Sequence, residues 1–314
     1  MVELSDPIFH DESAARVHFE NLRWPDGVSC PHCGAVEKAT RLQGKSHRAG
    51  LYQCNGCRAN FSVTVGTVME RTRVPLHKWA LAFHMMASSK KGVSAHYLHR
   101  SLGVTYKTAW FMAHRIREAM MPEPDPPFGG GGTPVEVDET FIGQEPGAKR
   151  AKAGYGHKMK VLTIIDRATG QARSSVINSV SINEIAPIMD AAISRQAVLM
   201  TDESKVYAGI GWNFAEHHIT THRAQEYVSP RNNLIHTNTV EGFYSIFKRG
   251  MKGVYQHCGR QHLHRYTAEY DFRYSNRNRL GVSDDSRARR AIAGAWGRRL
   301  TYRRLVRRAS PTPD

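Results

Sequence analysis

Two Cys-x-x-Cys pairs restrict the folding of this chain more tightly than any other feature of its sequence. Cys30 and Cys33 form the first pair, Cys54 and Cys57 form the second, and twenty residues separate the pairs. Each pair can form a tight turn whose backbone N–H groups point at the thiolates. Two such turns supply the four soft ligands of a closed, tetrahedral structural zinc site. A redox pair or a disulfide is the alternative, but two spaced pairs in a cytosolic chain favour Zn²⁺. We therefore predict a zinc ribbon and a short lead-in helix within residues 1–70.

The stretch from residue 75 to residue 121 has the apolar spacing of helices. Gly103 lies between two short helical segments, where a sharp turn needs the positive φ that glycine adopts readily. Thr105 is suited to cap the second helix. We predict a helix-turn-helix over residues 71–121, with Lys107 and Arg115 on the helix that enters the major groove. An ordinary helical hairpin is the alternative interpretation.

Residues 122–134, rich in proline and glycine, predict a linker, and the pattern changes after it. The short β-rich runs VEVDETFI, KVLTIID and SSVINSV precede a helix from Ser181 and a buried strand, AVLMTD. EHHITTH predicts a fifth strand, and two helices follow from about residues 238 and 262. Strands that alternate with helices in this way predict an α/β domain with a mixed sheet and flanking helices over residues 135–280. A basic tail is expected over residues 281–314.

Three acidic residues of this domain are candidate ligands for a divalent cation. Asp138 lies inside an apolar strand, Asp202 follows a buried one, and Glu241 comes early in a helix. In a sheet of the ribonuclease H type, the first strand is central, the fourth pairs beside it, and the later helix packs across their ends. The three carboxylates would then converge. Two divalent cations held by carboxylates activate the nucleophile and stabilise the leaving oxygen in phosphodiester cleavage.

Each carboxylate also has a structural interpretation. Asp202 could be a turn residue, and Glu241 could complete a capping box with Asn238. Asp138 is the hardest to explain structurally, because a charge inside an apolar strand is costly unless it is paired or bound to metal. Its neighbours Glu136, on the same face, and Glu139, on the other, are rival candidates.

The charge balance favours a polyanionic partner, since 44 Lys and Arg residues against 28 Asp and Glu residues give a formal net charge of +16. Charge alone does not separate DNA from RNA or from an anionic membrane. Lys248, seven residues after Glu241, lies on nearly the same helix face and could hold a DNA phosphate. We find no stretch long and apolar enough to cross a bilayer and no signal-peptide pattern, so we expect a cytoplasmic location.

Taken together, these motifs resemble those of bacterial insertion-sequence transposases that place a zinc ribbon before an ISXO-type DDE domain. The resemblance extends from about residue 24 to residue 277. Its motifs are CPHCG, YQCNGCRANFSVTVGTVM, VEVDETFIG, TDES followed by Tyr207, HTNTVEGFYSIFKRGMKGVYQH and YDFRYSNR. Their combination is far more specific than any one of them.

The resemblance implies a ribonuclease H-like fold and a catalytic DDE triad of Asp138, Asp202 and Glu241 that holds Mg²⁺ or Mn²⁺. Some relatives use Asn as the third residue, which keeps Asn238 as a rival to Glu241. The resemblance also implies binding of terminal inverted repeats by the N-terminal domains. Because two DNA ends have to be paired, we expect a homo-oligomer, at least a dimer, on DNA in the bacterial nucleoid. We assign the expected DNA contacts of the catalytic domain to the following basic residues: Lys149, Arg150, Lys248 and Arg249.

Three functions remain open from the sequence. The first is a transposase that cuts DNA with metal-activated water and joins the 3′-OH to target DNA. The second is a domesticated DNA-binding regulator that does not cut, although the presence of all three acidic residues argues against it. The third is a ribonuclease H-like nuclease with another substrate, which the separate DNA-reading modules make less attractive.

Overall fold

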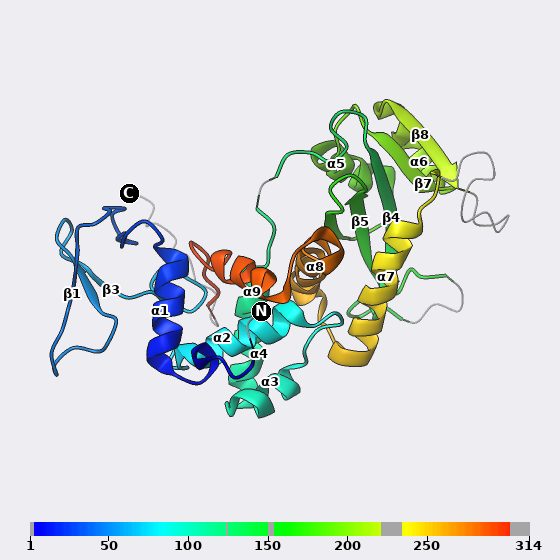
Figure 1. Ribbon diagram of the computed structural model, residues 1–314. Coiled ribbons are helices and arrows are strands. Elements are labelled where there is room, and N and C mark those ends of the chain that lie inside the picture. The colour runs from blue at the N-terminus through cyan, green and yellow to red at the C-terminus, as the bar shows by residue number, and fades with distance from the viewer. Residues whose placement is uncertain (1–2, 124, 150–153, 221–233, 302–314) are drawn as a thin grey trace, which may run out of the picture. The chain divides into compact units, whose positions relative to one another are not determined.

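The computed structural model describes residues 3–123, 125–149, 154–220 and 234–301. The chain divides into two units (Figure 1). One unit holds residues 84–94 and 120–288, and the other holds the described residues up to 83, residues 95–119 and the chain from residue 289. The division falls inside helices α2 (Leu76–Ser88) and α9 (Asp284–Ala293). No helix in the described ranges is long and apolar enough to span a membrane.

The first unit is built on a five-stranded mixed sheet in the order β6-β5-β4-β7-β8. Its strands are β4 (Pro134–Ile142), β5 (Met159–Asp166), β6 (Ala172–Ile177), β7 (Val198–Asp202) and β8 (Glu216–Thr220). β4 pairs antiparallel with β5 and parallel with β7. The first strand is therefore central and the fourth lies beside it. The ribonuclease H-like fold class predicted from the sequence is confirmed, including its fifth strand.

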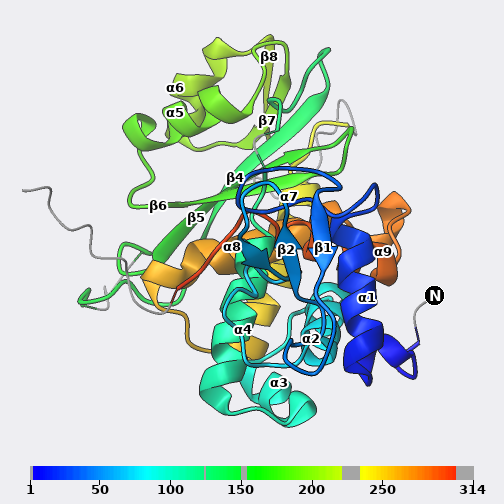
Figure 2. The ribbon, with the colours of Figure 1, turned by 90° about the vertical axis from the view of Figure 1, so that its left-hand side faces the viewer.

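Helices cover both faces of this sheet (Figure 2). They are α5 (Ile182–Ala192), α6 (Lys205–Ile210), α7 (Asn238–Gly250) and α8 (Arg260–Ser275). Successive side chains of a strand point to opposite faces, so β4 contributes to two cores. Val135 and Val137 pack with α5 and α6, whereas Ile142 packs with α7 and α8. Glu136 and Asp138, two and four residues from the strand start, share the α7 face.

Part of the predicted linker is packed in the core of the first unit. Phe128 is buried, its N–H donates to the Ala192 carbonyl (2.8 Å), and its carbonyl accepts from Ser194 N–H (2.7 Å). Gly129 follows with φ +78°, and a Cβ atom there would lie 2.3 Å from Ala197 Cβ. The structure thus differs from an open linker here, because the one large apolar residue of the stretch anchors it to α5. The domain boundaries remain a prediction.

The second unit contains a three-stranded antiparallel sheet and several helices. Its complete elements are α1 (Glu12–Arg23), β1 (Ala39–Arg41), β2 (Tyr52–Cys54), β3 (Asn60–Phe61), α3 (Ala95–Leu102) and α4 (Tyr106–Ala119). Trp24, Tyr52 and Phe61 form an aromatic cluster with ring centroids 5.6–5.9 Å apart. β3 ends at Phe61, because a turn follows in which Val65 N–H donates to the Ser62 carbonyl.

Part of the predicted basic tail is folded in this unit. Val68 N–H donates to the Ala295 carbonyl (3.2 Å), and Thr67 forms a bridge with Trp296. The Arg298 guanidinium donates to the Glu118 carbonyl (2.8 Å). Residues 295–298 therefore belong to the packed structure of this unit, and the Arg298 guanidinium donates a hydrogen bond inside it.

Candidate active site

Two of the predicted ligands lie on neighbouring parallel strands. Glu136 of β4 is the register partner of Met200 of β7. Asp138 and Asp202 each follow two residues later on their strands, and they are near enough for the negative charge of Asp202 to raise the pKa of Asp138. Alternation places both side chains on the face that α7 covers, and both are half-buried. The structure therefore brings together the two aspartates that stand 64 residues apart in the sequence.

Helix α7 places Glu241 over the same part of the sheet. Tyr244, one turn after Glu241, donates its hydroxyl to the main-chain carbonyl of Asp138 (2.6 Å) and to that of Val161 (3.3 Å). The helix is therefore anchored on β4 at the residue that carries the candidate ligand. In the sequence, Tyr244 is one of several apolar residues at helical spacing in this segment. Its helical spacing from Glu241 was visible, but its hydroxyl contact with another strand was not.

The electrostatics of Asp138 reflect this convergence. Burial holds the pKa of its carboxyl well above the ordinary value, and the negative charges of Glu139, Asp202 and Glu241 raise it further. Asp138 Oδ1 accepts a hydrogen bond from Glu139 N–H (2.8 Å), which partly offsets these effects. A half-buried carboxyl whose pKa is raised by neighbouring negative charges is stabilised in its charged form by a bound cation.

Glu136 and Glu139, the rival candidate ligands on β4, both have structural partners. Glu136 is fully buried, forms an ion pair with the Arg167 guanidinium, and lies 3.3 Å from His236 Nδ1. Its other oxygen accepts from Val240 N–H (2.9 Å) in the first turn of α7. Glu139 faces the opposite core, where it accepts a hydrogen bond from the Tyr207 hydroxyl. Neither carboxylate needs a metal ion to explain its position.

The alternative interpretation, in which Glu241 forms a capping box with Asn238 as the N-cap residue, is wrong. Thr237, not Asn238, is the N-cap residue of α7, and it makes no side-chain cap hydrogen bond. Glu136 from β4 supplies an acceptor for this helix end instead. Asn238 lines a pocket of about 760 Å³ together with Phe243 and Tyr274. It stays a predicted alternative to Glu241.

Lys248 lies beside the acidic residues, two turns after Glu241. Burial lowers the pKa of its ammonium group, the carboxylates of Asp138 and Glu241 raise it, and Lys252 and Lys158 lower it. The ammonium group therefore lies near both carboxylates at the edge of the site. Arg249 and Lys149 are exposed, as a DNA contact requires, whereas Arg150 lies outside the described residues.

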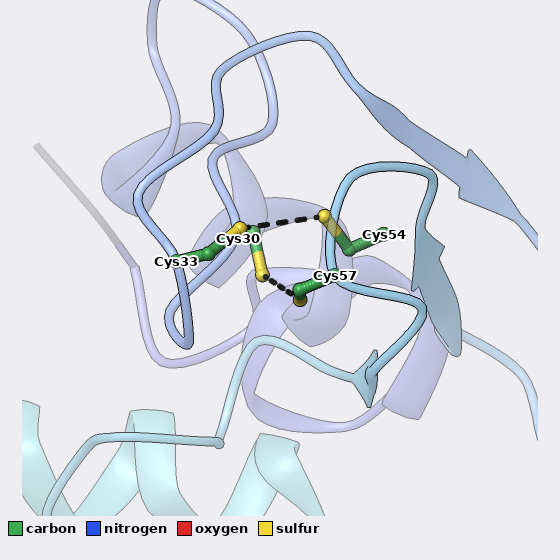
Figure 3. A group of neighbouring side chains, drawn as sticks. All are labelled: Cys30, Cys33, Cys54 and Cys57. Atoms are coloured by element: carbon green, nitrogen blue, oxygen red, sulfur yellow. Dashed lines mark hydrogen bonds between the residues drawn. The ribbon is translucent and has the colours of Figure 1, made fainter.

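The four cysteines of the ribbon form the one group of three or more His, Cys, Asp or Glu residues in the described chain whose ligand atoms all lie within 4.8 Å of one another. Figure 3 shows the two pairs facing each other, with Cys30 Sγ 3.7 Å from Cys57 Sγ and Cys33 Sγ 3.6 Å from Cys54 Sγ. A tetrahedral ion with Zn–S bonds of about 2.3 Å separates its sulfurs by about 3.8 Å. The sulfurs are not joined by disulfides and are consistent with a structural zinc site.

The two cysteine turns have the same backbone design. Gly34 N–H donates to the Cys30 carbonyl and Arg58 N–H donates to the Cys54 carbonyl, both at 2.9 Å, and Gly34 and Arg58 both have positive φ. The N–H groups of Cys57 and Gly56 act on the sulfur of Cys54 and lower the pKa of its thiol to about 6. The second turn thus favours the thiolate of Cys54, the form that binds metal, whereas burial and the neighbouring sulfurs raise the pKa of the Cys57 thiol to about 11.

The predicted helical hairpin is present in α3 and α4. Gly103 has φ +59°, and Thr105 Oγ1 accepts from Thr108 N–H (3.2 Å) as an N-cap. Lys107 is exposed on α4. Arg115 differs from its predicted role in the groove, because its guanidinium is half-buried and donates to the main-chain carbonyls of Glu70 and Leu300 (both 3.2 Å). Lys107 stays a predicted DNA contact of this helix.

Comparisons with known proteins agree with this architecture. Residues 10–60 match the transposase zinc-ribbon domain, and residues 130–275 match the ISXO2-like transposase domain. The chain is also 28% identical over 256 residues to an uncharacterized protein in transposable element ISH50 of Halobacterium salinarum. That match covers 77% of this chain and 83% of the relative.

Proposed function

We propose that this chain, which belongs to the insertion-sequence transposases that combine a zinc ribbon with an ISXO2-like transposase domain, cuts the ends of its element and joins the 3′-OH to target DNA. One observation carries the proposal. The Asp138 carboxyl lies near enough to Asp202 and Glu241 for their negative charges to raise its pKa, and α7 is hydrogen-bonded to β4 at Asp138. The family assignment supports a transposase, and this geometry supports the chemistry.

Asp138, Asp202 and Glu241 are the residues that would hold Mg²⁺ or Mn²⁺, since hard cations prefer carboxylate oxygens. Bound there, such ions lower the pKa of water and stabilise the leaving oxygen of a phosphodiester. Half burial keeps the carboxylates partly out of water while leaving them accessible to a DNA backbone. The hydrogen bond from Tyr244 fixes the main chain at Asp138.

The basic residues around the site hold and orient the DNA. Lys248 is placed to contact the phosphate that lies over Asp138 and Glu241. Lys149, Arg150 and Arg249 contact phosphates further along the strand, and such contacts give affinity without sequence preference. No serine or tyrosine nucleophile is required, so no covalent protein–DNA intermediate forms.

The N-terminal modules read the terminal inverted repeats. The four cysteines hold a structural Zn²⁺ ion that fixes the ribbon, and the α3–α4 hairpin presents Lys107 to the major groove. Two element ends must be held at once, so at least two copies of the chain act together on DNA. The protein works in the cytoplasm, at the nucleoid.

Cleavage and end binding, measured separately, test this proposal. A plasmid carrying the element is incubated with Mg²⁺ or Mn²⁺ and with the variants Asp138→Ala, Asp202→Ala and Glu241→Ala. Each loses a ligand whose contribution is several kcal/mol, so strand cleavage falls at least about 100-fold. Asp190→Ala removes an exposed carboxylate from α5 and serves as the matched control.

The outcomes separate the candidate functions. If the three variants lose cleavage and retain end binding, the result supports the transposase. Wild-type protein that binds element ends and never cuts them is instead a DNA-binding regulator. If Asn238→Ala abolishes cleavage while Glu241→Ala does not, Asn238 is the third ligand.

A further inference from the structure

An exposed aromatic side chain lies on the hairpin that connects β4 and β5, close to the basic edge of the active site. Tyr155 is 57% exposed, and its ring stacks on Phe141 with the centroids 4.9 Å apart and the planes 23° apart. Phe141 belongs to β4, three residues after Asp138. The proposed chemistry does not use this aromatic pair.

The hairpin holds the pair in place through its own backbone. Glu145 N–H donates to the His157 carbonyl (2.8 Å), and Lys158 N–H donates to the Tyr155 carbonyl (2.9 Å). The Glu145 carboxylate also accepts from the Arg260 guanidinium at the start of α8 (2.9 Å). The ring of Tyr155 therefore rests on a braced turn and a core strand.

Positive charge surrounds this ring. The Lys158 ammonium lies over the Tyr155 ring, 4.9 Å from its centroid. Lys158 is also near enough to Lys248 to lower the pKa of that ammonium group. Lysines thus connect the carboxylate site to the aromatic pair, which is the charge pattern of a surface that follows a phosphate backbone.

We propose that Tyr155 is a stacking platform for an unpaired nucleobase of the DNA strand whose phosphate lies at Asp138, Asp202 and Glu241. The inference rests on the proposed DNA-cutting function. Bases inside a duplex stack on one another, so only an unpaired base at a strand end or a distorted step can reach the ring. Every base has a π face, so this site discriminates little between sequences.

Competition for the ring face of Tyr155 favours the base. Stacking of a base on an aromatic side chain is stronger than contact between a lysine and an exposed ring. The Lys158 ammonium is on a flexible side chain. When a base occupies the ring face, the ammonium group moves to the phosphate of the same nucleotide. The Phe141 ring then lies beneath Tyr155 as the inner member of a three-ring stack.

The distance along the strand fits a base a few nucleotides from the cut. Asp138 and Phe141 are three residues apart on β4, about 10 Å at strand spacing, and alternation puts their side chains on opposite faces of the sheet. A strand that holds a phosphate at Asp138 therefore has to pass the end of β4 before its base reaches the ring, which takes a few nucleotides. The platform therefore holds the end of the reacting strand, not a remote part of the element.

The test uses the full chain and single-stranded DNA without added divalent metal, so that no cleavage occurs. A 15-nucleotide oligonucleotide carries 2-aminopurine, whose fluorescence is quenched on stacking. We expect Tyr155→Ala to weaken binding about 10-fold, or about 1.4 kcal/mol, and to relieve the quenching. Tyr155→Phe keeps both, since the ring face and not the hydroxyl makes the contact.

Trp212→Ala is the matched control, because Trp212 is 91% exposed in the same unit and belongs to a different segment, after α6. Its removal leaves binding and quenching unchanged. The inference is overturned if Tyr155→Ala binds and quenches as wild type does, or if Tyr155→Phe loses as much as Tyr155→Ala. Quenching by a wild-type protein that never cuts DNA would refute the proposed function and leave the platform in place.

Discussion

Glu136 is the residue through which the structure makes its sharpest prediction about stability. Its fully buried carboxylate pairs with Arg167, contacts His236 and accepts a hydrogen bond from Val240 in the first turn of α7. The Arg167 guanidinium also donates to the carbonyls of Leu234 and His236. A single side chain thus connects the central strand to the start of the helix that carries Glu241.

Replacement of Glu136 by alanine leaves the guanidinium and the helix N–H without this acceptor. Removal of one partner from a buried ion pair costs about 3–5 kcal/mol, and the lost helix cap is included in that figure. Glu136→Gln keeps a carbonyl oxygen in place but loses the charge, so its cost is about 1–3 kcal/mol. DNA cleavage falls with both variants, because α7 no longer fixes Glu241 over the sheet.

Urea-induced unfolding measures these costs, and hydrogen exchange at the Val240 amide shows whether the first turn of α7 opens. Glu145→Ala is the control, since Glu145 pairs with Arg260 at a partly exposed position where an ion pair contributes at most about 1 kcal/mol. A cost for Glu136→Ala no larger than that of the control would refute the reasoning.

Three further predictions concern zinc, charge and pH. Zn²⁺ chelation, or Cys57→Ser, is expected to abolish binding of element ends while metal-dependent nicking of non-specific DNA persists; end binding that survives complete zinc loss would show that the ribbon is not the reader. Lys248→Ala is expected to weaken DNA binding and to reduce its salt dependence by about one phosphate contact, with Lys248→Arg near wild type, as salt titrations by fluorescence anisotropy would show. Burial raises the pKa of Asp271 to about 7 despite hydrogen bonds from Ser174. Because the folded state holds this proton more tightly than the unfolded state, its stabilising contribution is complete below about pH 4 and is lost as the pH rises to about 7. Asp271→Asn should remove this part of the pH dependence of unfolding, and an unchanged pH profile would contradict the assignment.

Much of the fold followed from local patterns in the sequence. The apolar alternation of VEVDETFI and the buried run AVLMTD gave both strands that carry aspartates. The glycine at position 103 and the cap at Thr105 marked the α3–α4 hairpin, and the cysteine spacing gave the ribbon. These features depend on neighbours within a few residues, which a sequence displays directly.

The parts that escaped prediction depend on distant partners. Asn238 and Glu241 have capping-box spacing, but the acceptor comes from Glu136, 104 residues before Val240. The sequence predicted that Arg115 contacts the major groove, but its guanidinium donates hydrogen bonds to two main-chain carbonyl groups, one of them 185 residues away. The proline and glycine content around Phe128 suggested an open linker, because no local pattern revealed that α5 would bind it.

Binding of Mn²⁺ to the metal-free catalytic site tests the central claim most directly. Electron paramagnetic resonance counts the ions held by the wild-type chain and by the variants Asp138→Ala, Asp202→Ala and Glu241→Ala, with Asp190→Ala as control. The account predicts bound Mn²⁺ in wild type and control and its loss in each of the three variants. Mn²⁺ binding that is unchanged in all three would contradict a shared carboxylate site.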